Sequence, residues 1–133
     1  MTAILVDDEP DGIRTLKKML ELNCPEVEIQ ATCSNSIDAM RKLEEMKPDL
    51  VFLDVRMPGK SGMDMLAELS EIDFEVIFVT AHDEYMLQAL QFSAVDYLMK
   101  PVDEDRLQEA MQRVEKRLKE KKNSNLKYKK KWS

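Results

Sequence analysis

Short apolar runs alternate along the chain with longer segments in which apolar residues recur every three or four positions. The short runs have the length and composition of buried strands and comprise Ala3–Val6, Val27–Cys33, Leu50–Leu53, Val76–Val79 and Val95–Met99. The remaining periodic segments predict helices near residues 11–22, 37–43, 63–69, 84–91 and 104–118. This alternation predicts an α/β domain with a doubly wound, five-stranded parallel sheet covered by helices on both faces.

Charge divides the chain into two parts. Residues 116–133 hold nine Lys or Arg and one Glu, a local charge of +8, so the net charge of −6 leaves −14 for residues 1–115. The acidic body disfavours phosphate backbones and anionic membranes as partners. We expect a domain over residues 1–120 and a basic tail or the start of a linker over 121–133. A solvated extension is the favoured explanation of the tail, while Tyr128 and Trp132 keep a nucleic-acid contact open.

Cysteine and hydrophobicity patterns place the chain in a reducing, aqueous compartment. Cys24 and Cys33 have no metal-ligand spacing with His82, so we expect both thiols to be reduced and structural. No apolar stretch approaches the roughly 18–20 residues that a bilayer span needs, and the N-terminus has no signal-type segment. We therefore expect a cytoplasmic protein without a membrane partner.

The predicted strands end on polar residues of complementary chemistry. Asp7 and Asp8 follow the first strand, Asp54 the third, Thr80 the fourth and Lys100 the fifth. Because the carboxyl ends of parallel strands lie at one edge of a sheet, we expect these side chains to converge in a crevice. The sequence therefore predicts an anionic site assembled from distant segments.

This combination of side chains suits phosphoryl transfer. Carboxylates about 4 Å apart repel by roughly 4 kcal/mol at an effective dielectric of about 20, and Mg²⁺ would relieve that repulsion while also binding phosphate. Lys100 can hold a phosphoryl oxygen as a point charge, and Thr80 can donate its hydroxyl proton. Asp54, flanked by metal and ammonium, is equipped to attack phosphorus and form an acyl phosphate.

Each of these residues also has an ordinary explanation when it is considered alone. Asp7 and Asp8 could form a solvated turn or a helix N-cap, Thr80 could be a strand-end hydroxyl, and Lys100 could be a surface charge. Tyr97 fits a core position by its periodicity. The joint placement of these residues at strand ends favours the site.

The same residues carry the resemblance to a known family. The motifs are Asp7–Asp8, Asp54–Pro58 followed by Gly62, and Thr80–Ala81, each after its predicted strand, and Tyr97–Pro101, which spans the end of the fifth predicted strand. In this order they resemble the receiver domain of two-component response regulators over residues 1 to about 120. The resemblance implies a flavodoxin-like (CheY-like) fold, (βα)5, with strand order 2-1-3-4-5.

The resemblance also implies a role for each site residue. Asp54 would be the phosphoacceptor for a sensor histidine kinase or a small phosphodonor. Asp8 and Asp54 would bind Mg²⁺ directly, Asp7 largely through water, and Arg56 through its backbone carbonyl. Thr80 and Lys100 would contact the phosphoryl group, Thr80 and Tyr97 would form the switch pair, and a cis peptide bond would precede Pro101.

A finer resemblance concerns the output. The segment 78–102 is similar to receivers attached to LytTR-type (LytR/AlgR-type) DNA-binding domains, which implies that DNA is bound only through a C-terminal domain absent from this chain. The region 84–117 is the expected output face, where phosphorylation would alter homodimerisation or release a partner. A stand-alone receiver without DNA-binding output is the alternative within this class.

Arg56 and His82 lie two residues after Asp54 and Thr80, respectively. We hypothesise that they tune the lifetime of the phosphorylated state by controlling the access of water. The alternative is that both face solvent and are inert.

Other function classes fit less well. A phosphohydrolase of the haloacid-dehalogenase type would share the Asp nucleophile, Mg²⁺ and a Lys, but it needs a second Asp where this chain has Arg56. A scaffold that never reacts is a further alternative, although all of the key residues are present. We therefore expect a signalling phosphoacceptor rather than an enzyme, with chemistry limited to its own phosphorylation and dephosphorylation.

Overall fold

The computed structural model describes the main chain of residues 1–132 and the side chains of residues 1–124. The strands are β1 (Thr2–Val6), β2 (Glu28–Cys33), β3 (Leu50–Leu53), β4 (Glu75–Thr80) and β5 (Asp96–Met99). The helices are α1 (Pro10–Asn23), α2 (Ser36–Met46), α3 (Gly62–Glu68), α4 (Met86–Gln91) and α5 (Glu104–Trp132).

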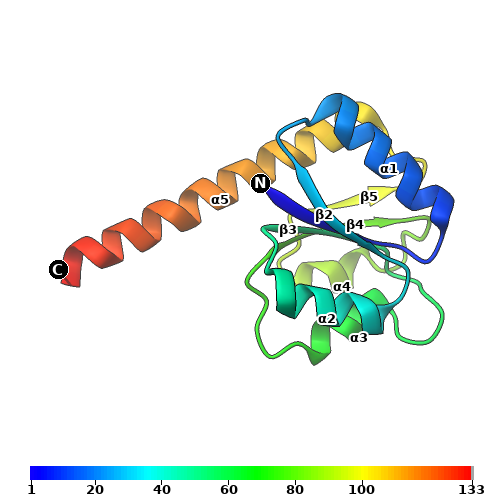
Figure 1. Cartoon of the computed structure of the whole chain (residues 1–133), viewed down its shortest axis with the longest axis horizontal. Helices are drawn as coiled ribbons and strands as arrows, with labels where there is room; N and C mark the ends of the chain where they lie inside the picture. Colours follow the sequence, from blue (N-terminus) through cyan, green and yellow to red (C-terminus); the bar gives the residue numbers. More distant parts are fainter. Residues whose placement is uncertain (133) are drawn as a thin grey trace.

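All neighbouring strands pair in parallel, and the sheet has the order β2-β1-β3-β4-β5. Helices α1 and α5 cover one face, and α2, α3 and α4 cover the other (Figure 1). The predicted flavodoxin-like (CheY-like) doubly wound sheet and its strand order are therefore confirmed.

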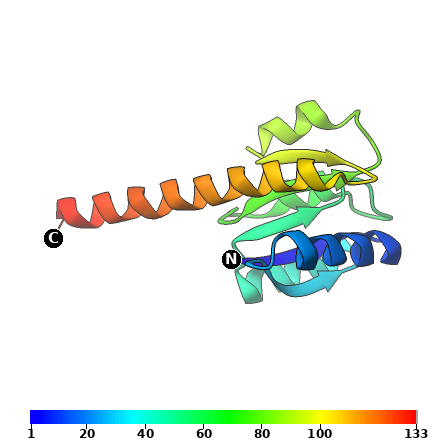
Figure 2. The ribbon, with the colours of Figure 1, turned by 90° about the horizontal axis from the view of Figure 1, so that it is seen from above.

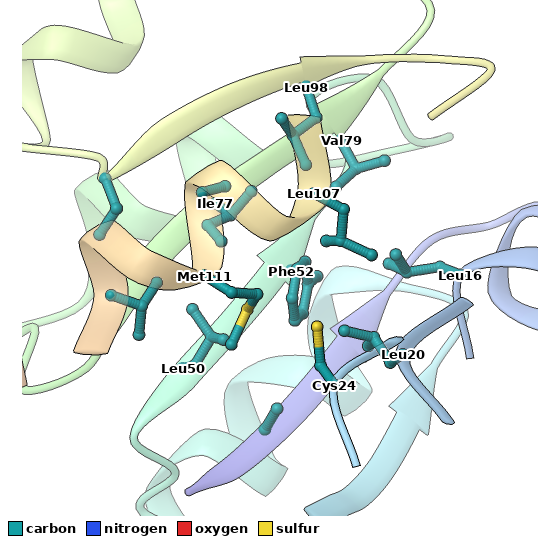
Figure 3. Close-up of a cluster of buried hydrophobic side chains, with 14 of the residues drawn as sticks. Leu16, Leu20, Cys24, Leu50, Phe52, Ile77, Val79, Leu98, Leu107 and Met111 are labelled. Carbon is teal, nitrogen blue, oxygen red and sulfur yellow. The ribbon is translucent and has the colours of Figure 1, made fainter. Parts of the chain in front are cut away.

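Two apolar cores lie on opposite faces of the sheet because successive side chains of a strand point in opposite directions. Figure 3 shows the core beneath α1 and α5, where Phe52 packs among Leu16, Leu20 and Met111. On the other face, Phe78 packs against residues of α2, α3 and α4. The whole of β3 is buried, as expected for a central strand of a parallel sheet.

The segment after β4 differs from the sequence prediction. The predicted helix 84–91 begins only at Met86, because the preceding loop is held in another conformation. The His82 backbone N–H donates to the Thr80 hydroxyl, and the His82 carbonyl accepts a hydrogen bond from the Tyr97 hydroxyl. These tertiary contacts override the helical periodicity of the segment.

Helix α5 continues without interruption past Glu120, so no break in the helix marks the predicted boundary (Figure 2). Near that position, the Lys121 ammonium donates to the backbone carbonyl of Asp73 at 2.8 Å. The side chains of Tyr128 and Trp132 lie outside the described residues. The assignment of 121–133 as a tail or linker stays a prediction.

Both cysteines are buried and free. Burial raises the pKa of the Cys33 thiol to about 11, which agrees with the predicted structural role. In the part of the chain that the structure describes, no helix combines the length and the apolar composition needed to cross a bilayer.

Candidate functional site

The predicted acidic residues Asp7, Asp8 and Asp54 meet Lys100 at the carboxyl edge of the sheet, where hydrogen bonds fix the main chain to neighbouring strands. The Asp7 amide donates to the Cys33 carbonyl at 3.0 Å, and the Asp54 amide donates to Val6 at 3.0 Å. The Lys100 amide donates to the Thr80 carbonyl at 2.9 Å. The hydrogen-bond ladder of the sheet therefore continues into the site and fixes the main-chain positions of Asp7, Asp54 and Lys100.

Carboxylates gather at this edge. One oxygen from each of Asp7, Asp8, Glu9 and Asp54 lies within 4.8 Å of the others. Such a set of hard oxygen donors is compatible with a divalent cation such as Mg²⁺. Glu9 was not predicted as a member, although it directly follows Asp7 and Asp8 as a third consecutive acid.

Lys100 bridges two of these carboxylates. Its ammonium lies 2.7 Å from Asp7 Oδ2 and 3.0 Å from Asp54 Oδ2. Burial by itself would lower the pKa of Lys100, but hydrogen bonds and the charges of Asp7 and Asp54 outweigh burial and raise it. Burial raises the pKa of Asp7, and the hydrogen bond from Lys100 offsets part of that shift. Lys100 is therefore charged and aimed at the carboxylate predicted to accept phosphate.

Backbone amides orient the same carboxylates. The Arg56 N–H donates to Asp54 Oδ1 at 3.2 Å, and the Glu9 N–H donates to Asp7 Oδ1 at 3.0 Å. Asp54 is buried, with a side chain only 5% exposed, whereas Arg56 is exposed. The predicted metal contact of the Arg56 carbonyl stays a prediction.

Thr80 and Tyr97, the predicted switch pair, are joined through the main chain of His82. The His82 N–H donates to Thr80 Oγ1 at 3.3 Å, while the Tyr97 hydroxyl donates to the His82 carbonyl. The Tyr97 ring packs on Phe78 with centroids 6.0 Å apart. Burial and nearby carboxylates raise the pKa of Tyr97 to about 12, so its phenol remains a donor at neutral pH. Sequence reasoning did not assign this backbone role to His82.

The His82 side chain takes part in a different contact. Its Nδ1 lies 3.5 Å from a carboxylate oxygen of Glu84, and its ring meets Tyr85 edge to face with centroids 6.5 Å apart. The imidazole therefore packs with residues of the β4–α4 loop.

Gly12 and Gly62 lie against the site at positions where an added Cβ atom would clash with neighbouring atoms. A Cβ at Gly62 would lie 2.4 Å from the backbone oxygen of Asp54 and 2.9 Å from the Leu53 side chain. A Cβ at Gly12 would lie 2.4 Å from Asp7 Oδ2 and 3.3 Å from the Lys100 ammonium. Distances of this kind come from the folded arrangement and could not be obtained from the sequence pattern.

A family model described as the response regulator receiver domain matches residues 3–112. A response regulatory protein of Vibrio cholerae is 43% identical over 115 residues, which cover 86% of this chain and 48% of that protein. The positive alginate biosynthesis regulatory protein of Pseudomonas aeruginosa is 41% identical over 117 residues, covering 86% and 47%. The Escherichia coli transcriptional regulatory protein BtsR is 38% identical over 112 residues, covering 84% and 46%.

Solved structures agree with these relatives. The response regulatory domain of mrkE from Klebsiella pneumoniae superposes with a TM-score of 0.82 at 25% identity, covering 90% of this chain and 99% of that one. The receiver domain of AraT from Geobacillus stearothermophilus gives 0.81 at 25% identity, covering 91% and 97%.

The chain spans about half the length of the curated relatives it matches. Two of those relatives are named as regulatory proteins of transcription or of alginate biosynthesis, which is consistent with the predicted LytTR-type subfamily. The family match, together with the acidic edge and its bridging lysine, supports one identification. The chain belongs to the response regulator receiver domain family.

Proposed function

We propose that this chain is a phosphorylation-dependent receiver whose phosphoacceptor is Asp54. The observation that carries the proposal is the contact between the Lys100 ammonium and Asp54 Oδ2 at 3.0 Å, beside an acidic cluster suited to a divalent cation. The Lys100 ammonium would neutralise part of the charge that an incoming phosphoryl group brings, and a divalent cation held by the acidic cluster would neutralise more of it.

Asp8 and Asp54 would hold Mg²⁺ directly, with Asp7 acting through water and Arg56 through its carbonyl. Bound there, Mg²⁺ supplies charge neutralisation of the phosphoryl oxygens. Glu9, whose carboxylate belongs to the same cluster, would add a further negatively charged oxygen donor. The residues present therefore fit the cation that the family implies.

In the phosphoryl transfer, a carboxylate oxygen of Asp54 forms a bond to phosphorus. The bond from phosphorus to the imidazole nitrogen of a phosphohistidine breaks at the same time, and that nitrogen keeps the electron pair. Receivers of this family work with sensor histidine kinases, so such a kinase is the proposed donor. Lys100 leaves its contact with Asp54 and pairs with a phosphoryl oxygen. The Thr80 hydroxyl donates a hydrogen bond to a second phosphoryl oxygen.

The switch follows from the hydrogen bonds of the β4–α4 loop. When the Thr80 hydroxyl turns toward the phosphoryl group, it no longer accepts from the His82 N–H, and the position of the His82 carbonyl that binds Tyr97 changes with it. Charge-assisted hydrogen bonds of roughly 1.5–3 kcal/mol each can supply the 5.5 kcal/mol or so that a complete two-state switch requires.

The proposed output face is region 84–117. On its α4 helix, Leu87 is 79% exposed, Leu90 is 70% exposed and Met86 is 45% exposed. An apolar face of this kind suits homodimerisation. Transcriptional output would require a DNA-binding domain beyond this chain, of the LytTR type.

The direct test is to incubate the chain with Mg²⁺ and a small acyl phosphate, and to measure the intact mass and the modified peptide. We expect one phosphoryl group on Asp54, and none in Asp54→Asn or when Mg²⁺ is chelated. Asp83→Asn, which removes an exposed carboxylate in the β4–α4 loop, should label normally. If Asp54 is not phosphorylated, the alternative of a scaffold that never reacts would be favoured. If the chain hydrolyses many equivalents of the phosphodonor rapidly, the phosphohydrolase alternative would be favoured.

The lifetime hypothesis has a separate test. Arg56 is exposed next to Asp54, and His82 packs with the loop after Thr80. Substituting both Arg56 and His82 should change the dephosphorylation rate of Asp54 by altering the access of water to its phosphoryl group. Labelling of Asp54 should persist in this variant. An unchanged rate would contradict their proposed role.

A further inference from the structure

A groove lies between α2 and α3 at the edge of the sheet opposite the acidic site. Its volume is about 690 Å³, and Leu43, Leu69 and Phe74 contribute to an apolar floor. Leu43 is buried, whereas Leu69 and Phe74 are half-buried. The groove is therefore a concave surface with apolar side chains accessible to a partner.

The rim of the groove is acidic. Its charged residues are the acids Glu44, Asp49, Glu68, Glu71 and Asp73 and the bases Arg41 and Lys47. Glu68 pairs with Lys60, and the Asp49 carboxylate accepts hydrogen bonds from Thr2. Glu44, Glu71 and Asp73 are exposed and form no ion pair among the residues whose side chains are described. Cationic groups would therefore be favoured along this rim.

The basic part of α5 leaves the body beside this groove. Lys121 donates to the backbone carbonyl of Asp73, a residue of the rim, at 2.8 Å. Lys119 and Lys122 are exposed next to it, and the sequence continues with Lys127 and Lys129–Lys131. Helix α5 runs on as a continuous helix and extends away from the body of its own chain (Figure 1). No residue of α5 lines the groove of the same chain among the described side chains.

We propose that the groove between α2 and α3 binds the basic α5 segment, residues 119–131, of a second copy of this chain. Each copy carries both an acidic groove and a basic helix, so a two-fold dimer satisfies both contacts with the same pair of surfaces. The basic segment also contains Leu126 and Tyr128, which matches a groove with an apolar floor inside an acidic rim. This proposal is independent of phosphorylation.

The association should be weak and sensitive to salt, because exposed ion pairs contribute about 0.2–1 kcal/mol each and are screened. Sedimentation velocity of the unphosphorylated chain at low salt should show a concentration-dependent dimer. Raising the salt to about 0.5 M should increase the dissociation constant at least severalfold.

Charge reversal tests which surfaces meet. Glu44→Lys with Glu71→Lys should raise the dissociation constant about tenfold or more, and Lys119→Glu with Lys122→Glu should do the same. When the two double variants are mixed, each helix meets a groove of opposite charge, so a heterodimer should form where neither variant dimerises alone. Glu45→Lys provides a matched control, because Glu45 is exposed on α2 and does not line the groove.

Two outcomes would overturn the proposal. One is a monomer at every salt and protein concentration tested. The other is a dimer that both double variants leave intact while Leu87→Glu with Leu90→Glu abolishes it, since the α4 face would then carry the association. Circular dichroism of each variant checks that its fold is preserved.

Discussion

Lys100 determines the charge balance of the acidic edge. Its ammonium contacts Asp7 and Asp54, so it offsets their mutual repulsion in the metal-free protein. Asp8 and Glu9 belong to the same cluster but form no ion pair among the residues whose side chains are described. The cluster therefore retains uncompensated negative charge that a divalent cation would neutralise.

Asp8→Asn should stabilise the metal-free protein. Removing one charge from the cluster relieves repulsion of about 1 kcal/mol after screening at this half-exposed position, which corresponds to a rise in Tm of roughly 4 °C. The same change should abolish Mg²⁺ binding. Thermal unfolding in a chelator and titration with Mg²⁺ measure the two effects. Asp83→Asn is the control, and a fall in Tm specific to Asp8→Asn would show that the cluster is not repulsive.

Gly62→Ala should destabilise the protein and slow the labelling of Asp54. The added Cβ would meet the Asp54 backbone oxygen at 2.4 Å, and the main chain cannot yield as a flexible side chain can. A loss of about 2 kcal/mol is expected from overpacking. The measurements are denaturant unfolding and the rate of phosphorylation.

Gly59→Ala is the matched control for that change. Gly59 has φ +83° and no atom within 4 Å of its added Cβ, so the substitution should cost about 1 kcal/mol of conformational energy. It should leave the labelling rate unchanged. Equal effects of the two variants on labelling would contradict a specific role of the Gly62 contact.

Individual site residues differ in how far the sequence could reveal them. Asp7, Asp54 and Lys100 were predictable because each follows an apolar run, and parallel strands bring such positions together. Glu9 and His82 were missed in their observed roles. The role of Glu9 depends on the distances between its carboxylate and those of the neighbouring acids, which the sequence does not give. The role of His82 uses its backbone N–H and carbonyl, which any residue type except proline could supply.

Among the elements, the β4–α4 loop connects the candidate site to the proposed output face. Its conformation depends on the two hydrogen bonds at the His82 main chain rather than on helix propensity. For this reason the predicted start of the fourth helix was two residues early. Apolar periodicity within the segment cannot reveal that Tyr97, from β5, binds the loop.

Tyr97→Phe should loosen this loop without unfolding the domain. Loss of the phenol removes one hydrogen bond, at a cost of about 1 kcal/mol. Hydrogen exchange at residues 81–85 should become faster. Tyr85→Phe removes a phenol that donates no hydrogen bond among the described residues and should have a smaller effect. Equal exchange in wild type and Tyr97→Phe would show that the Tyr97 bond does not hold the loop.

Helix α5 is anchored to the sheet by arginines as well as by its apolar stripe. Arg106 and Arg113 contact the Asp96 carboxylate on β5, and Arg117 contacts Glu75 and the Ser93 carbonyl. The apolar stripe was apparent in the sequence, but the arginine partners were not, because they lie on other strands and loops. These contacts join α5 to the first residues of β4 and β5 and to the loop after α4.

For the molecule as a whole, Mg²⁺ should act as a stabilising ligand. A cation that binds the folded state alone adds about 2.7 kcal/mol at a concentration 100-fold above its Kd. Thermal unfolding across a Mg²⁺ titration should show this increase, and Asp8→Asn should remove it. A monovalent salt matched in ionic strength is the control. An equal shift with that salt would indicate general screening of the acidic body instead of a site.

The architecture was predictable to a greater extent than the assembly. Alternation of apolar runs and periodic segments is enough to specify a doubly wound sheet, since crossover handedness and burial leave few alternatives. The groove between α2 and α3 was not foreseen, because it depends on how the ends of separate helices are spaced. Its acidic rim emerges only when residues from 44 to 73 are brought together.

The hydrogen bonds that fix Asp7, Asp54 and Lys100 to adjacent strands have a mechanical consequence. A covalent change at Asp54 cannot be absorbed by sliding one strand against another, because that would break the ladder on either side. Strain created at this edge must instead be relieved in the connecting loops. The rigidity of the sheet would thereby direct the effect of the proposed phosphorylation toward those loops.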